Sequence, residues 1–254
     1  METKKQKIFI HIVCNSLIFL CLAVVVVSSL ILKDKQTQGV SNSEYRGTIY
    51  AGDKNSNNVS LMINVYWGTE YVEKMLDILK KQNVKTTFFV GGTWAKENPK
   101  ILKRMFEEGH EIASHGYSHK EHGKLDYTGN LSEIQKCHEL VKELIGVEME
   151  LFAPPGGSYN DSTTKAASFL GYKTIMWTRD TIDWRDHNTS LIFNRAVTNM
   201  AGGDLILMHP TANTLEAFSN IIEYAKNHKF NICKVSETLG LVWQVTFSKN
   251  VKKL

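Results

Sequence analysis

The sequence predicts an α/β protein: a distorted (β/α) barrel of about seven parallel strands, preceded by one N-terminal transmembrane helix. Short apolar runs alternate with amphipathic segments of helical length from residue 59 to residue 235. The chemically active side chains gather where the apolar runs end, and an uncharged apolar run stands near the N-terminus. Strands that alternate with such helices indicate βαβ units, and barrels of this kind carry their sites at the carboxyl ends of the strands.

The first predicted element is a membrane anchor. Residues 8–32 form an uncharged run of 25 residues, which as a helix measures roughly 37 Å and exceeds a hydrocarbon core of about 30 Å. Three lysines precede it, so residues 1–7 are expected to stay in the cytoplasm and the rest of the chain to lie outside a single-pass cell membrane. A secretory signal cleaved near Ser28–Ser29 is the alternative, and both export the domain. Residues 33–58 are polar and predict a linker.

The alternation of strands and helices fills the next part of the chain. Strands are predicted at residues 59–65, 86–90, 111–115, 148–153, 173–177, 204–209 and 231–235. Helices are predicted at residues 70–82, 99–108, 132–144, 162–170, 190–200 and 214–227. In each helical segment the apolar residues recur on one face. The domain is therefore expected to span residues 59–240, followed by a basic tail at 241–254.

Composition excludes several classes of protein. Hydrophobic residues make up 43% and charged residues 22% of the chain, which is typical of a globular domain. The net charge of +4 is small and the basic residues are scattered, so no nucleic-acid partner is expected. Four cysteines are too few for a disulfide scaffold. Cys137 and Cys233 are expected to be buried thiols, with a single bridge between them as the open alternative.

A pair of histidines is the first candidate for chemistry. His115 and His119 stand in the segment His-Gly-Tyr-Ser-His, at the end of a predicted strand. Residues four apart present both rings on one face of a helical turn, where neutral imidazoles share a divalent cation such as zinc. A catalytic zinc usually takes three protein ligands, so the rest of the chain must supply the third. Taken alone, such a pair is more often a surface or core feature.

Five blocks of sequence occur in a recognisable order. They read KMLDILKKQNVKTTFFVGG, EEGHEIASHGYSH, LFAPPGGSYND, TRDTIDW and LILMHPT. In this order the chain resembles the polysaccharide deacetylase family, the NodB-homology domain, and is most similar to the subgroup associated with sporulation in Gram-positive bacteria. The resemblance implies a distorted (β/α) barrel, a divalent metal, and hydrolysis of N-acetyl groups in peptidoglycan or a chitin-like polymer. Cell-wall polysaccharide is then the expected partner, together with the membrane that holds the N-terminal helix.

The resemblance also implies roles for residues of the second and fifth blocks. His115 and His119 match the family's metal ligands. His209 matches the general acid that protonates the departing amine, and Leu207 matches the pocket for the acetyl methyl group. A lone histidine at the end of an apolar strand is otherwise most often a core residue.

The third and fourth blocks match residues that surround the substrate. Asp180 and Asp183 match an Asp-x-x-Asp-Trp block in which a carboxylate orients the general acid, and Trp184 matches the wall of the sugar groove. A helix cap is the alternative role for this block. Gly156 matches the family's backbone oxyanion donor and follows Pro155, although this Pro-Pro-Gly-Gly stretch also reads as a rigid turn.

One block departs from the family pattern. Where the family has Thr-Phe-Asp-Asp-Gly-Pro, this chain reads from Met62 to Gly68 as MINVYWG. Asn64 is expected at the position of the general base, and Val65 or Tyr66 at that of the metal-binding carboxylate. An amide cannot take a proton from water at neutral pH, and loss of a general base costs roughly 10² to 10⁴ in rate. The family's arginine before the paired prolines is also absent, because Ala153 stands there.

Four side chains are candidates to replace the lost carboxylates. His122 would share a helical face with the histidine pair if that turn continued, although a surface loop fits equally. Glu70 reads as a first-turn acid favoured by the helix dipole. Asp204 is excluded by distance, because it lies five residues before His209 on one strand, roughly 16 Å away at about 3.3 Å per residue. Asp180 remains a candidate because it ends a strand.

Two functions remain open on the sequence. The first is an exported, membrane-anchored, metal-dependent polysaccharide deacetylase with an altered site. The second is a catalytically weak or inactive member of the family that serves as a glycan-binding or assembly module.

Overall fold

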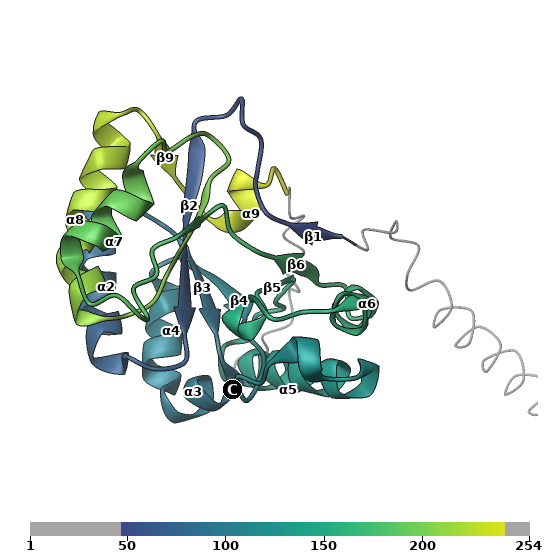
Figure 1. Cartoon of the computed structure of the whole chain (residues 1–254). Helices are drawn as coiled ribbons and strands as arrows, with labels where there is room; N and C mark the ends of the chain where they lie inside the picture. The colour runs from purple at the N-terminus through teal and green to yellow at the C-terminus, as the bar shows by residue number, and fades with distance from the viewer. Residues whose placement is uncertain (1–46, 242–254) are drawn as a thin grey trace, which may run out of the picture. The chain divides into compact units, whose positions relative to one another are not determined.

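A computed structural model of the chain describes residues 47–241 (Figure 1). The expected membrane anchor at residues 8–32, the cytoplasmic tail and most of the basic C-terminal tail lie outside the described residues. Within residues 47–241, no helix is long and apolar enough to cross a membrane. The described residues therefore cover the predicted domain and the last part of the predicted linker.

The described residues form one curled parallel sheet. Its strands are β1 (Thr48–Ile49), β2 (Asn58–Val65), β3 (Thr87–Val90), β4 (Glu111–Ser114), β5 (Leu151–Phe152), β6 (Lys173–Ile175), β7 (Arg179–Asp180), β8 (Leu205–Met208) and β9 (Asn231–Ile232). The strand order is β1-β6-β5-β4-β3-β2-β8-β7, and β9 pairs with β2. All these pairings are parallel, as the sequence predicts. Within the described residues no ladder joins β7 to β1, so the sheet is a half-barrel. The two edge strands of two residues each offer few groups for closure.

Eight α-helices of residues 47–241 surround the sheet, and all but the last lie on its outer side. They are α2 (Thr69–Gln82), α3 (Gly92–Glu97), α4 (Pro99–Glu107), α5 (Tyr127–Ile145), α6 (Asp161–Phe169), α7 (Thr189–Val197), α8 (Ala212–Asn227) and α9 (Val235–Thr238). Two 3₁₀ turns, η1 (His122–Lys124) and η2 (Pro155–Gly157), follow β4 and β5. Figure 1 shows α2, α7 and α8 together on one side of the sheet. The six predicted helices are confirmed, while α3 and α9 were missed because they are too short to show a period.

Helix α2 shows why the sequence pattern translates into this packing. Its four buried residues are Val72, Met75, Leu76 and Leu79, which recur on one face of the helix. Burying each large side chain contributes roughly 1.5–3 kcal/mol. The helix ends at Asn83, whose left-handed backbone lets its N–H reach the last carbonyl groups. The apolar face therefore fixes which side of α2 lies on the sheet.

The core has two parts because side chains alternate across each strand. One part lies between the sheet and the helices. The other fills the inside of the curl, with Met62, Phe89, Ala113, Leu151, Ala153, Ile175, Leu205 and Val235. Helix α9 covers the amino ends of the strands, because the Val235 N–H donates to Thr87 Oγ1 at 2.8 Å and the Ser236 N–H donates to Glu111 Oε2 at 3.2 Å. Helix α9 thus covers one end of the curl, at the amino ends of the strands.

The expected linker is wrong at its end, whereas the expectation that Cys137 and Cys233 are buried thiols is confirmed. The linker expected at residues 33–58 gives way to folded structure at its end, because β1 pairs with β6 and the Gly52 N–H donates to Gly203 O at 2.8 Å. A two-residue strand carries no period by which sequence could find it. The possible bridge between Cys137 and Cys233 does not form, since both are free and buried. Burial raises the pKa of the Cys137 thiol to about 12.

Candidate active site

A cleft of about 520 Å³ opens at the carboxyl ends of the strands. It is lined by Asn64, Trp67, His119, Gly156, Trp177, Asp180, Trp184, Leu207 and His209. The structure therefore brings together most of the residues that the sequence singled out. Two indoles of this lining, Trp67 and Trp177, were missed because a tryptophan near a strand end carries no signal of its own.

His209 is held by a buried carboxylate. It follows β8, and its Nδ1 lies 2.8 Å from Asp183 Oδ1, while its backbone N–H donates to Asp183 Oδ2 at 2.6 Å. Thr214, in the first turn of α8, donates its hydroxyl to the same Oδ2 at 2.6 Å. Asp183 and Thr214 are fully buried. With Nδ1–H given to the carboxylate, the other ring nitrogen of His209 is left for a substrate.

The two aspartates of the Asp-x-x-Asp-Trp block have different places. Asp183 orients His209, whereas Asp180 ends β7 and lines the cleft. Asp180 Oδ1 accepts the N–H of Ile182 at 2.8 Å, so this carboxylate also fixes the loop between them. The alternative of a simple helix cap is wrong for this block, because Asn188 is the residue that caps α7.

His115 and His119 come together without a helical turn. The backbone from 115 to 121 is a loop, and His119 has φ of 54°. The ring centroids still lie 5.1 Å apart. His115 Nδ1 is 2.7 Å from Ala153 O, so this nitrogen carries the hydrogen and Nε2 keeps its lone pair. Burial lowers the pKa of both imidazoles, which favours the neutral form that binds metals.

The side chains considered as a third ligand lie elsewhere. His122 is buried in η1, where its Nδ1 is 2.7 Å from Asn130 Oδ1 and its ring packs on Phe152. Glu70 is exposed in the first turn of α2, as the dipole argument predicts. Asp204 pairs with Arg179 Nε at 2.5 Å. None of these three replaces the lost carboxylates.

The donor set falls short of a catalytic zinc site. Across residues 47–241 no group of three His, Cys, Asp or Glu side chains is placed to hold a metal ion. A catalytic zinc usually takes three protein ligands, and the histidine pair supplies two. The residues present therefore do not fit that site, although the two free imidazole lone pairs fit a weakly held divalent ion.

Aromatic rings stand against the histidines. Tyr66 stacks on His119 with centroids 4.6 Å apart, and Trp67 stacks on His209 with centroids 5.4 Å apart and planes 12° apart. Val65 instead points to the helix side, where it is fully buried in the core. It is therefore not a position from which a carboxylate could reach the histidine pair.

Gly68 sets the register of the altered block. Its φ is 71°, and a Cβ placed there would lie 1.9 Å from Pro210 O, so only glycine fits. With the glycine of the family block set on Gly68, the two carboxylate positions fall on Tyr66 and Trp67. We infer this register in place of the expected one at Asn64 and Val65. Asn64 lines the cleft, but its Oδ1 is buried without a hydrogen-bond partner.

The remaining predicted residues form the walls of the cleft. Trp184 is 52% exposed, and the guanidinium of Arg185 lies 5.8 Å from its ring. Gly156 borders open space, since no heavy atom lies within 4 Å of a Cβ placed there. Pro155, in contrast, is buried as the first residue of η2 and is absent from the lining of the cleft. Leu207 adds an apolar side chain to the lining of the cleft.

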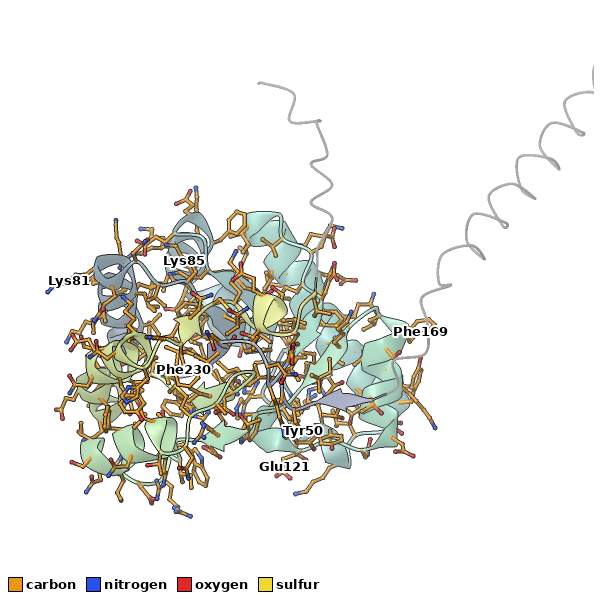
Figure 2. The ribbon with its side chains drawn as sticks, turned by 90° about the horizontal axis from the view of Figure 1, so that it is seen from above. Tyr50, Lys81, Lys85, Glu121, Phe169 and Phe230 are labelled. Carbon is orange, nitrogen blue, oxygen red and sulfur yellow. The ribbon has the colours of Figure 1, made fainter. Side chains whose placement is uncertain are left out.

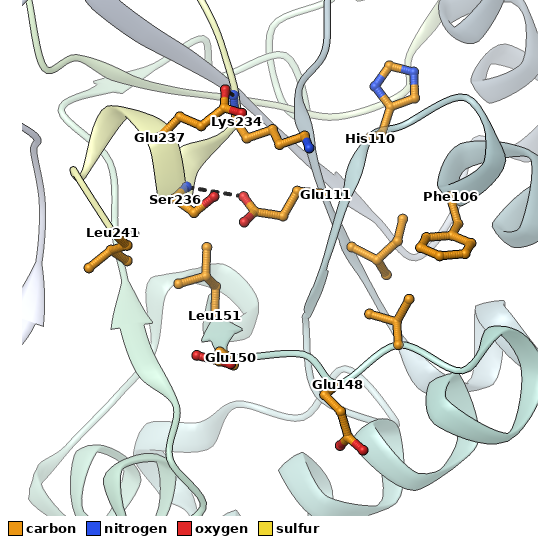
Figure 3. Close-up of a pocket in the computed structure, with 12 residues that line it drawn as sticks. Phe106, His110, Glu111, Glu148, Glu150, Leu151, Lys234, Ser236, Glu237 and Leu241 are labelled. Atoms are coloured by element: carbon orange, nitrogen blue, oxygen red, sulfur yellow. Dashed lines mark hydrogen bonds between the residues drawn. The ribbon is translucent and has the colours of Figure 1, made fainter. Parts of the chain in front are cut away.

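A second cavity, of about 450 Å³, lies at the amino ends of β4 and β5. Figure 3 shows its walls, with Glu111 bonded to Ser236 of α9. His110 and Lys234 contribute further lining. None of the predicted site residues lines it, and β4 separates it from His115, so it belongs to the closed end of the sheet.

The sequence of this chain is similar to those of several known proteins. A model of the polysaccharide deacetylase family matches residues 51–175. The uncharacterized protein YlxY of Bacillus subtilis is 40% identical over 75% of this chain, which spans only 60% of that relative. A peptidoglycan-N-acetylglucosamine deacetylase of Bacillus cereus is 32% identical over 66% of this chain and 82% of its own length.

Solved structures with the same fold include a protein described as lacking the family's activity. The crystal structure of a CE4 family pseudoenzyme from Bacillus anthracis has a TM-score of 0.75 and 35% identity, over 77% of this chain and 70% of its own. A mutant of that pseudoenzyme is described as having restored enzymatic activity, and it matches with a TM-score of 0.75, 34% identity, and coverage of 77% and 72%.

Proposed function

The chain belongs to the polysaccharide deacetylase family, and from this premise we propose that its cleft hydrolyses N-acetyl groups of cell-wall glycan at a low rate. The substrate we propose is peptidoglycan, on which the named deacetylase relative acts. One observation carries the proposal: His209 faces the cleft with Nδ1 held by buried Asp183. A histidine oriented in this way can hold a proton for the departing amine. The backbone N–H of Gly156 is available to the oxygen that becomes charged.

The low rate follows from the missing base. Deacetylases of this family, also called CE4, are generally metal-dependent, whereas His115 and His119 have no third His, Cys, Asp or Glu side chain within residues 47–241 that is placed to complete a metal site. Neither Tyr66 nor Trp67 can take a proton from water as a carboxylate does, so a rate lower by roughly 10² to 10⁴ is expected. Zinc is the metal expected from the resemblance, but His115 and His119 supply only two of the three protein ligands that a catalytic zinc usually takes, so an ion there would be held weakly.

Binding without turnover is the second candidate, and it has its own supporting observation. At the two positions where the family's carboxylates are expected, Tyr66 stacks on His119 and Trp67 stacks on His209. The cleft keeps its volume and its three indoles, which suits a glycan even without hydrolysis. The similar Bacillus anthracis protein is described as a pseudoenzyme. On this alternative the domain is a glycan-binding or assembly module.

The location of the domain is part of the same proposal. The uncharged run at residues 8–32 supports a single-pass membrane anchor with the domain outside the cell. Such a location agrees with a peptidoglycan substrate. The sequence resemblance to the sporulation-associated subgroup adds that the protein acts on the wall of a spore-forming cell.

Release of acetate tests the two candidates. The full chain is incubated in detergent with N-acetylglucosamine oligomers and peptidoglycan, with added zinc or with chelator. Slow release by the wild type that His209→Ala abolishes supports the hydrolase. A Tyr66→Asp, Trp67→Asp double variant should release acetate faster, and an Asn64→Asp, Val65→Asp variant should not. Glycan binding without any release by the wild type would support the binding module instead.

A further inference from the structure

We propose that Trp67 is a sugar-stacking residue, on which the apolar face of an uncharged N-acetylhexosamine ring packs without a metal ion. The inference rests on the proposed function and names how that cleft holds its glycan. Trp67 stands at a position where the family's carboxylate is expected. Its role is therefore binding rather than catalysis.

The first support is the way the ring is held. Trp67 stands two residues after the end of β2, and the left-handed turn at Gly68, packed against Pro210 O, fixes the backbone beside it. One face of the indole stacks on His209, with planes 12° apart. Because His209 is itself bonded to buried Asp183, the indole lies on a rigid support. A ring fixed before binding loses little conformational freedom when a sugar arrives.

The second support is exposure. Trp67 lines the cleft and keeps 40% of its surface exposed, although one face is covered. A large apolar side chain kept open beside a cavity marks a binding surface more often than a core position. Trp177 and Trp184 line the same cleft, so a sugar ring inside it meets indole on more than one side.

The third support is the charge of the lining. Among the nine residues that line the cleft, Asp180 is the only carboxylate, and no lysine or arginine is present. A phosphate or uronic acid would meet no lysine or arginine in this lining, whereas a neutral acetamido sugar needs no cation. The C–H bonds on one face of a pyranose carry partial positive charge and suit the negative face of an indole. The lining therefore selects uncharged hexosamines.

Calorimetry on the full chain in detergent tests this inference. The tetramer of N-acetylglucosamine is titrated into the wild type, Trp67→Phe and Trp67→Leu, all in excess chelator. Leucine keeps apolar bulk without an aromatic face, so Trp67→Leu should weaken binding about 10-fold, a loss that corresponds to ~1.4 kcal/mol. Trp67→Phe should stay within about 3-fold of the wild type, because it keeps an aromatic face. The affinity of the wild type for the tetramer should be the same in excess chelator as with added metal.

A matched control removes an exposed aromatic ring elsewhere. Phe169 is 65% exposed at the end of α6, at the edge of the molecule in Figure 2, and Phe169→Ala should bind as the wild type does. Equal affinity of Trp67→Leu and wild type would overturn the stacking role while leaving glycan binding intact. Wild-type binding that disappears with chelator would overturn metal independence. No wild-type binding with or without added metal would overturn the proposed function and this inference together.

Discussion

Removing the Asp183 carboxylate should destabilise the fold as well as the site. This side chain is fully buried and accepts three hydrogen bonds, two from His209 and one from Thr214. Hydrogen bonds to a charged group contribute roughly 1.5–3 kcal/mol each, and buried donors left without a partner add a penalty. Because the variant also removes the desolvation cost of a buried charge, the net loss in the free energy of unfolding for Asp183→Ala should be smaller than the sum of these bonds, about 3–5 kcal/mol. That is a large share of a typical total of about 5–15 kcal/mol.

Asp183→Asn should cost less and should change His209. The amide oxygen can replace Oδ2 and keep two of the bonds, which leaves its NH₂ group facing His209 Nδ1. The imidazole must then accept at Nδ1 and carry its hydrogen at Nε2, the wrong tautomer for a held proton donor. We expect a loss of about 1–2 kcal/mol in stability, and the loss of any acetate release. Thr214→Val, which removes one donor, should also cost about 1–2 kcal/mol.

Guanidinium unfolding followed by circular dichroism measures these differences. Asp180→Ala is the matched control, because this aspartate lines the cleft and accepts only the Ile182 N–H among the bonds found in the described residues. It should cost no more than about 1 kcal/mol. If Asp183→Ala unfolds within 1 kcal/mol of the wild type, the account of a buried three-donor carboxylate fails.

Three further predictions concern other parts of the fold. Burial lowers the pKa of His110 to about 4, so the unfolded chain binds this proton first as pH falls from 6.5, and the free energy of unfolding drops until about pH 4. Between pH 7 and pH 4.5, unfolding measurements should therefore show the wild type losing about 2.5 kcal/mol more than His110→Gln, with exposed His228→Gln as the matched control. Gly68→Ala should lower the melting temperature far more than Gly146→Ala, because both have positive φ but only Gly68 faces a backbone oxygen, and equal shifts would contradict the clash. Zinc should bind weakly in a competition with a chromophoric chelator and not at all to His115→Ala, whereas tight stoichiometric binding would reveal a ligand that the geometry lacks.

The sequence foretold the parts of the fold that carry a long period. All seven predicted strands and six predicted helices are present, with ends that shift by a few residues. Strands β1 and β7 have two residues each and escape any pattern. The predicted distorted barrel is present as a curled parallel sheet, and within the described residues β1 and β7 form its two open edges.

The sequence predicted which residues line the cleft better than it predicted how they are arranged. Residues on one edge of a parallel sheet meet because the carboxyl ends of the strands meet, so His119, Asp180 and His209 share one cleft. The register of the altered block depended on where a glycine is sterically required, which only the contact with Pro210 reveals. Likewise, the loop conformation of His119 brings it to His115 by a path that helical spacing does not describe.

The burial of Asp183 bears on how such a domain changes over generations. A mutation that removes this carboxylate leaves a less stable protein, so selection for folding alone is enough to retain it together with its bonds to His209 and Thr214. The exposed position of Trp67 has no comparable constraint, and a carboxylate there can disappear while the barrel still folds. The His209–Asp183 pair can therefore persist in a domain that has lost its hydrolytic activity. A later substitution that restores a carboxylate at the cleft surface would then meet a proton donor that is already in place.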